Sequence, residues 1–228
     1  MKDAQKIYFD LDHTLWDYDT NARETLNELF EEFNLDQCFT NAESFVKRFY
    51  FVNYQLWDRY NTGEIDRPFI RDNRFREILK GRIDAEEQVF RDMSDFFTGR
   101  CPHKPHLMPG AIEVLDYLSE NYRLGIMTNG FDDVQHIKLE KSGLKPFFEI
   151  VITSESSQAR KPDVAIYEHA LQLSSLKHNE VVMVGDNLNT DILGATRAGW
   201  HSLWYNPGRQ TGDHLHQIYH LKELSDLL

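Results

Sequence analysis

The sequence predicts an α/β fold built on a doubly wound parallel sheet, and three observations indicate it. Five short apolar runs, rich in Val, Ile, Phe and Tyr, have the length and composition of buried strands. Apolar residues at helical spacing separate the last four runs. A long stretch after the first run has helical periodicity alone, which predicts an all-helical insert. Repeated strand, helix and strand units close by right-handed crossovers and so build a parallel sheet.

The predicted strands cover residues 6–11, 123–128, 149–153, 181–185 and 201–205. The middle three do not alternate between apolar and polar residues, as expected for strands that helices cover on both faces. Helices are predicted after Pro109-Gly110, after Pro162-Asp163 and before Gly199, because proline and glycine mark helix ends. A last helix is predicted over residues 221–228.

The insert is predicted to be a helical cap domain over residues 17–98, with residues 1–16 and 99–228 forming the catalytic core. Its position after the first strand brings it near the carboxyl ends of the strands, where open α/β sheets bind ligands, so we expect it to act as a lid. At helical spacing, its aromatic residues are expected to be core rather than a base-stacking surface. They are Phe45, Phe49, Tyr50, Phe51, Tyr54, Trp57 and Tyr60.

Composition and charge exclude several classes of protein. Hydrophobic residues make up 41% and charged residues 27% of the 228 positions, which is ordinary for a globular protein. A net charge of −12 disfavours a nucleic-acid polymer or an anionic membrane surface as partner. No segment has the pattern of a secretory leader or a membrane span, and Cys38 and Cys101 form neither a disulfide framework nor a zinc motif. We therefore expect a cytoplasmic protein.

Acidic residues follow two of the predicted strands. Asp10 and Asp12 come directly after an apolar run, and the run at 181–185 is followed by Asp186, with Asp191 at the start of the next helix. Carboxylates gathered at one sheet edge repel one another unless a cation compensates them. Mg²⁺, which prefers carboxylates, waters and phosphate oxygens, is the expected ion. A role as cap of the following helix is an alternative for Asp191, and taken alone Asp10 could equally be a helix cap.

Two further strand ends carry groups suited to phosphate. Thr128, Asn129 and Gly130 offer a hydroxyl, an amide and backbone N–H groups, which suit phosphate oxygens. Lys161, just before Pro162, offers a positive charge that would neutralise a phosphoryl group. The sequence therefore predicts a site for a small phosphate ester.

In chain order, the four strand ends carry D-x-D-x-T, Thr-Asn-Gly, Lys-Pro and Gly-Asp-x-x-x-x-Asp. In this combination the chain resembles the haloacid-dehalogenase-like phosphatase superfamily, which has a Rossmann-like core and often a helical cap. The segments DLDHTLWD from Asp10, MTNGFDDVQHIKLEKSG from Met127 and MVGDNLNTDI from Met183 look like the pyrimidine 5'-nucleotidase branch. That resemblance implies hydrolysis of a nucleoside 5'-monophosphate.

The resemblance also implies a role for each residue. Asp10 would be the nucleophile that forms an aspartyl-phosphate, and Asp12 the general acid and then the general base. Mg²⁺ would be held by the carboxylates of Asp10 and Asp186 and the main-chain carbonyl of Asp12, with Asp191 orienting the surrounding waters. The transferring phosphoryl group would be bound by Thr128, Asn129 and Lys161.

Other functions remain open at this point. A phosphatase or mutase acting on a sugar phosphate or another small organic phosphate would use the same residues. A 2-haloacid dehalogenase is disfavoured by Asp12, because a halide leaves without a proton. A non-catalytic, receiver-like phosphoacceptor would leave residues 17–98 unexplained. Trp16 and Phe131, beside the motifs, are candidates for contacting a nucleoside, and the histidines at 214, 216 and 220 are expected to face solvent.

Overall fold

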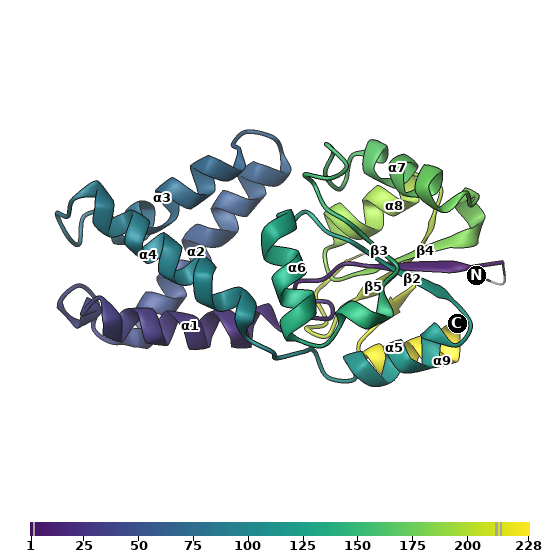
Figure 1. The fold of residues 1–228 in the computed structure, drawn as a ribbon, viewed down its shortest axis with the longest axis horizontal. Helices are drawn as coiled ribbons and strands as arrows, with labels where there is room; N and C mark the ends of the chain where they lie inside the picture. Colours follow the sequence, from purple (N-terminus) through teal and green to yellow (C-terminus); the bar gives the residue numbers. More distant parts are fainter. Residues whose placement is uncertain (2, 213, 215) are drawn as a thin grey trace. The chain divides into compact units, whose positions relative to one another are not determined.

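The protein consists of two compact units. The structure, a computed structural model, describes residues 1, 3–212, 214 and 216–228. One unit comprises Met1–Tyr18 with Pro105–Leu228 and holds the sheet, and the other comprises Asp19–Lys104 and is helical (Figure 1). The chain thus leaves the sheet unit after its first strand and returns to it before the second.

Within the part of the chain that the structure describes, the sheet has six strands, all parallel, in the order β3-β2-β1-β4-β5-β6. All five predicted strands are present, which confirms the fold class. The sixth, β6, was not predicted, because two residues are too few to show a periodic pattern. The strands are β1 (Lys6–Phe9), β2 (Arg123–Met127), β3 (Ile150–Ile152), β4 (Val181–Gly185), β5 (His201–Tyr205) and β6 (Gln217–Ile218).

Helices cover both faces of the sheet, as the doubly wound prediction requires. In Figure 1, α7 and α8 lie on one face and α5 and α9 on the other. The helices of this unit are α5 (Ala111–Ser119), α6 (Asp132–Lys141), α7 (Val164–Ser174), α8 (Leu193–Arg197) and α9 (Leu224–Leu227). A π-helical turn, Leu188–Ile192, precedes α8. The individual helix that the sequence analysis missed is α6, whose inward face is largely polar.

The register of the strands brings the sequence motifs together. Phe9 at the end of β1 lies opposite Ile126 of β2 and Val184 of β4, so the residues that follow these three positions meet at one edge of the sheet. Strand β1 ends two residues earlier than predicted, because the chain turns at Leu11. The carbonyl of Leu11 accepts the N–H of Trp16 at 2.9 Å. This turn gives Asp10 and Asp12 different surroundings.

The helical unit contains four α-helices among its residues, which the structure describes throughout: α1 (Tyr18–Glu32, which begins one residue before the unit), α2 (Ala42–Asn61), α3 (Arg67–Leu79) and α4 (Glu87–Arg100). Phe45, Phe49 and Tyr60 of α2 are buried, as predicted. Phe51 and Tyr54 are 57% and 74% exposed, so the prediction that they belong to the core is wrong. Helix α2 packs one face, and these two residues lie on another.

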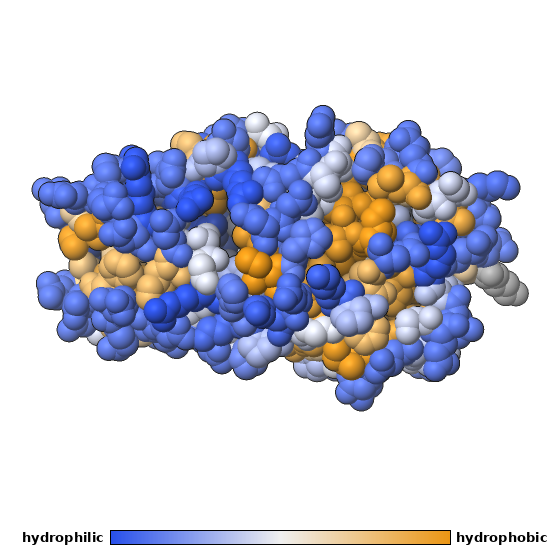
Figure 2. All heavy atoms as spheres, viewed as in Figure 1, coloured by the Kyte–Doolittle hydropathy of each residue, from blue (hydrophilic) through white to orange (hydrophobic). Residues whose placement is uncertain are grey.

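Hydrophilic residues make up much of the visible surface (Figure 2). Figure 2 shows hydrophilic residues over much of the visible face of each unit, with apolar residues in patches between them. Within the described residues, no helix combines the length and the apolar character that crossing a membrane would need.

Candidate active site

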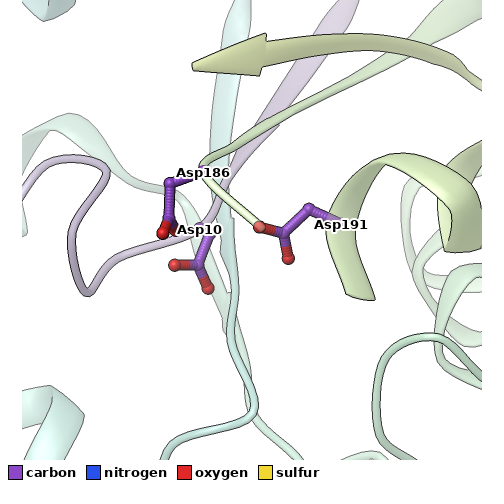
Figure 3. Close-up of side chains that lie close together, drawn as sticks. All are labelled: Asp10, Asp186 and Asp191. Atoms are coloured by element: carbon purple, nitrogen blue, oxygen red, sulfur yellow. The ribbon is translucent and has the colours of Figure 1, made fainter. Parts of the chain in front are cut away.

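Three aspartates converge beside the carboxyl ends of β1 and β4. One carboxylate oxygen from each of Asp10, Asp186 and Asp191 lies within 4.8 Å of the others (Figure 3). Asp10 follows β1, Asp186 follows β4, and Asp191 belongs to the π-helical turn. The structure thus brings together three of the four aspartates that the sequence analysis expected around a metal ion, and Asp191, which was expected only to orient waters, lies as close as the other two.

The position of Asp191 depends on a glycine and on a capping residue. A Cβ atom at Gly185 would lie 2.3 Å from Asp191 Oδ2, so only glycine leaves space for this carboxylate. The backbone N–H of Asn187 donates to the same oxygen at 3.0 Å. The side chain of Asn187 caps the turn by accepting from the N–H groups of Asn189 and Thr190. The carboxylate of Asp191 is therefore directed into the site and is not itself the cap.

Thr14, the last residue of the D-x-D-x-T motif, holds Asp186. Its hydroxyl donates to Asp186 Oδ1 at 3.2 Å and accepts from the Asp186 backbone N–H at 3.1 Å. The indole of Trp204 donates to the Asp186 carbonyl at 2.8 Å. These contacts fix the loop after β4 to the loop after β1.

Lys161 places a positive charge inside the cluster. Its Nζ lies 2.6 Å from Asp10 Oδ1 and 2.7 Å from Asp191 Oδ1, and the side chain is 2% exposed. Its Nζ also donates to the carbonyl of Met127 at 2.7 Å. The side-chain amide of Asn129 pairs with the Lys161 backbone through two hydrogen bonds of 2.8 Å. In this structure Asn129 therefore positions Lys161.

Burial and mutual repulsion shift the pKa values of the cluster. Burial raises the pKa of Asp10 to about 8, and the neighbouring carboxylates add to this while Lys161 opposes it. Burial and Asp191 raise the pKa of Asp186 to about 7. The pKa of Lys161 is raised, since its attraction to Asp10 and Asp191 outweighs the effect of burial. The site therefore carries more negative charge than Lys161 alone compensates.

The donor set fits a divalent cation. The three ionised carboxylates and one ammonium leave a formal charge of −2, and every candidate ligand is a hard oxygen, as Mg²⁺ prefers. The carboxylates of Asp10, Asp186 and Asp191 are those that would hold it. The side chain of Asp12 points elsewhere, so only its main-chain carbonyl remains as the expected ligand.

The carboxylate of Asp12 is bound by α6. Lys138 Nζ lies 2.6 and 2.8 Å from its two oxygens, and Gln135 Nε2 donates to Oδ2 at 3.0 Å. Burial alone would raise the pKa of Asp12, but Lys138 and Gln135 outweigh burial and lower it. The sequence analysis missed both residues of α6. Their signal was two polar residues three apart, on one helical face, directly after the Thr-Asn-Gly motif.

Thr128 and Trp16 both lie beside α6. Thr128 bonds to it, and Trp16 is buried against it instead of being open to a ligand. The Thr128 hydroxyl oxygen accepts from Gly130 N–H at 3.1 Å and from Gln135 Nε2 at 2.9 Å. Trp16 is fully buried, with Lys138 Nζ 4.5 Å from a ring centroid. The expectation that Trp16 contacts a nucleoside is therefore wrong, because its ring is part of the packing beneath α6.

Comparison with known families shows the family to which the chain belongs. A model of the haloacid dehalogenase-like hydrolases matches residues 7–199. The chain belongs to this family. The match spans both β1 and β4, and so includes every residue of the acidic cluster.

Curated relatives indicate which enzymes of the family this chain resembles. The pyrimidine 5'-nucleotidase YjjG of Escherichia coli is 32% identical over 88% of this chain and 85% of its own length. The pyrimidine 5'-nucleotidase PynA of Streptococcus pneumoniae is 28% identical over 97% of this chain and 94% of its own. These relatives place the chain among the phosphatases of its family, that is, among phosphoric monoester hydrolases.

A solved structure extends the likeness to the whole chain. The HAD-hydrolase YfnB of Bacillus subtilis, bound to magnesium, superposes with a TM-score of 0.89 at 25% identity and covers 99% of this chain and 98% of its own. That structure reveals interdomain movement. Haloacid dehalogenases also share the fold.

Proposed function

We propose that this hydrolase is a Mg²⁺-dependent phosphatase that cleaves a pyrimidine nucleoside 5'-monophosphate through an aspartyl-phosphate on Asp10. One observation carries the proposal: Asp10 contacts the ammonium of Lys161 and belongs to a cluster of carboxylate oxygens suited to Mg²⁺. A carboxylate in this position has both its own negative charge and that of an approaching phosphate compensated.

In the first step, an Asp10 oxygen attacks phosphorus and the bond from phosphorus to the ester oxygen breaks. Asp12 gives the leaving alkoxide a proton. Because Lys138 keeps Asp12 ionised in the resting structure, Asp12 takes up this proton from solvent before the alkoxide leaves. Lys161 and the hydroxyl of Thr128 bind phosphoryl oxygens during the transfer. The products are a free nucleoside and the phosphorylated Asp10.

In the second step, Asp12 removes a proton from water, and the water oxygen attacks the phosphorus of the aspartyl-phosphate. The bond from Asp10 to phosphorus breaks and inorganic phosphate leaves, which restores Asp10. Mg²⁺, when bound by Asp10, Asp186 and Asp191, would supply positive charge that draws the phosphate to the nucleophile and stabilises the transition state. Asp12 thus serves both steps, as acid and then as base.

The substrate class rests on the relatives. Both curated nucleotidases match most of this chain, including the helical unit. We assign the helical unit, Asp19–Lys104, the role of a cap that selects the substrate, and the interdomain movement described for YfnB supports a moving cap. A nucleotide substrate also agrees with a cytoplasmic location, which we propose with it.

A phosphate-release screen tests the proposal. Purified protein is incubated with nucleoside monophosphates, sugar phosphates and small organic phosphates, with Mg²⁺ or with a chelator. We expect pyrimidine 5'-monophosphates to have the highest kcat/KM, and the chelator to abolish turnover. Faster turnover of sugar phosphates would refute the nucleotide assignment and leave the phosphatase assignment intact. No phosphate release from any ester would refute both.

A dehalogenase is the second candidate, because dehalogenases share this fold. The two reactions differ in which bond water breaks. A phosphatase hydrolyses the bond to phosphorus, whereas a dehalogenase hydrolyses an ester at the carbon of its aspartate. A single turnover in heavy-oxygen water should therefore label the released phosphate and leave Asp10 unlabelled. Label in Asp10, with release of halide from a haloacid, would favour the dehalogenase.

A further inference from the structure

The inward face of α6 carries polar groups where a helix normally buries apolar ones. Gln135 is 0% and Lys138 5% exposed, beside the apolar Leu139. Burying an amide or an ammonium costs free energy unless the group is fully paired. Lys138 Nζ and Gln135 Nε2 are paired with residues of the candidate active site, whereas Gln135 Oε1 has no hydrogen-bond partner among the described residues. The polar contacts that this buried face makes are therefore contacts to the site.

Lys138 and Gln135 both bind the carboxylate of Asp12. Lys138 Nζ contacts both oxygens of Asp12, at 2.6 and 2.8 Å, and Gln135 Nε2 contacts one of them at 3.0 Å. Within the described residues, the hydrogen bonds to this carboxylate come from α6. Contacts to both oxygens oppose rotation of the carboxylate about its terminal bond. The orientation of Asp12 is therefore set by α6.

The same glutamine also binds the phosphate-binding hydroxyl. Gln135 Nε2 donates to Thr128 Oγ1 at 2.9 Å, and Gly130 N–H donates to it at 3.1 Å. A hydroxyl oxygen has two acceptor positions, and these donors fill both. The Thr128 O–H is thereby left to act as a donor toward another group, which is the role that a phosphoryl oxygen requires.

Gly130 allows this arrangement. A Cβ atom at position 130 would lie 1.9 Å from Gln135 Nε2, so any other residue would displace the amide. The ring of Trp16 covers the ammonium of Lys138 at 4.5 Å. Gly130 thus leaves space for the Gln135 amide, and Trp16 packs against the Lys138 ammonium.

We propose that Lys138 and Gln135 are positioning residues for the hydrolysis. Lys138 orients the Asp12 carboxylate toward the ester oxygen. Gln135, which bonds both side chains, sets the distance between the Asp12 carboxylate and the Thr128 hydroxyl. This inference rests on the proposed function, since it gives α6 a role in the proton transfers of that reaction. If the ion pair between Lys138 and Asp12 only anchored α6, its loss would lower kcat/KM for all substrates alike.

The test compares leaving groups. A p-nitrophenolate leaves without a proton, whereas a nucleoside alkoxide needs one. Because kcat/KM reports steps up to release of the alcohol, Lys138→Met should lower kcat/KM for the nucleoside monophosphate ~100-fold and for p-nitrophenyl phosphate less than ~5-fold, as expected for lost general acid catalysis. Lys138→Arg should recover part of the loss. Lys141→Met, an exposed residue of the same helix, should match the wild type.

The second step has its own signature. In Lys138→Met, Asp12 is also a misaligned base, so hydrolysis of the aspartyl-phosphate slows. With p-nitrophenyl phosphate we expect a burst of about one p-nitrophenolate per enzyme followed by a slower steady state, since the first step no longer limits turnover. If Lys138→Met does not fold, Lys138→Arg carries the same comparison, with a loss of ~10-fold for the nucleotide alone.

Equal losses on both substrates in a folded variant would overturn the proposal and leave the phosphatase assignment standing. A wild-type protein that releases no phosphate from any ester would instead refute the proposed function, and the positioning roles with it. A larger loss on the nucleotide, together with the burst, supports both.

Discussion

Replacing Lys161 by methionine tests how far the acidic cluster depends on its internal cation. The ammonium lies 2.6 Å from Asp10 and 2.7 Å from Asp191, and methionine keeps much of the volume while removing the charge. Removing one partner of a buried ion pair costs about 3–5 kcal/mol, because the other charge stays buried. Without Mg²⁺, we expect the variant to lose that much stability at pH 7.

The cost of protonating a carboxyl gives an independent estimate of this destabilisation and predicts how it changes with pH. The variant can avoid the unpaired charge by protonating one carboxyl. Measured against the unfolded chain, where a carboxyl has its ordinary pKa, this protonation costs about 4 kcal/mol at pH 7 but only about 1.5 kcal/mol at pH 5, at 1.36 kcal/mol per pH unit. The destabilisation should therefore shrink as the pH falls. For a protein of this size, the expected loss in Tm is about 6–20 °C at pH 7 and about 3–6 °C at pH 5.

The assay is thermal unfolding of the metal-free wild type, Lys161→Met and the surface control Lys141→Met at both pH values. Added Mg²⁺ should recover part of the loss, because a divalent cation compensates the same carboxylates. A Tm shift below about 2 °C at pH 7, or one that is equal at both pH values, would refute the electrostatic account of the site.

Two further predictions concern the metal and α6. Burial raises the pKa values of Asp10 and Asp186 to about 8 and 7, from 3.8, so the metal-free folded state binds more protons than the unfolded state and loses stability as pH rises toward 8. Mg²⁺ must displace these protons, so the rise in Tm that Mg²⁺ causes should be larger at pH 8 than at pH 6. Calorimetry should detect the released protons. An equal rise in Tm at both pH values would contradict this prediction. Gly130→Ala should displace Gln135 and lower kcat ~10–100-fold at a stability cost of about 1–3 kcal/mol, and a wild-type kcat would show that the amide can move freely.

The strand-end aspartates were predictable because two simple regularities combine. An apolar run followed by Asp indicates the end of a buried strand, and parallel strands end at the same edge of the sheet. Asp10 and Asp186 satisfy both, and the register of β1 against β4 brings them together. The same reasoning accounts for Thr128, which directly follows β2, whereas Lys161 lies in the loop between β3 and α7 and was recognised by its place before Pro162.

The contacts of α6 escaped prediction for the opposite reason. Amphipathic patterns identify helices by their apolar face, and α6 buries Gln135 and Lys138 instead. Their partner, Asp12, is more than 120 residues away in sequence, at separations of 123 and 126. No local pattern contains such a pairing, although two polar residues on one helical face after a Thr-Asn-Gly motif are a signal that can be sought in other sequences.

Exposure within the helical unit was also predicted only in part. Helical spacing identifies which aromatic residues share a face, but not how wide the packed face is. In α2, Phe45 and Phe49 are covered by neighbouring helices, while Phe51 and Tyr54 are exposed. The number of helices that pack around α2 decides the difference, and that number is a property of the tertiary structure.

The most direct test of the central claim is to identify the residue that carries the phosphoryl group. Protein quenched in acid during turnover, digested and examined by mass spectrometry should show one phosphoryl group on the peptide that contains Asp10, and Asp10→Asn should show neither this adduct nor turnover. A phosphoryl group on another residue, or full turnover by Asp10→Asn, would contradict the account.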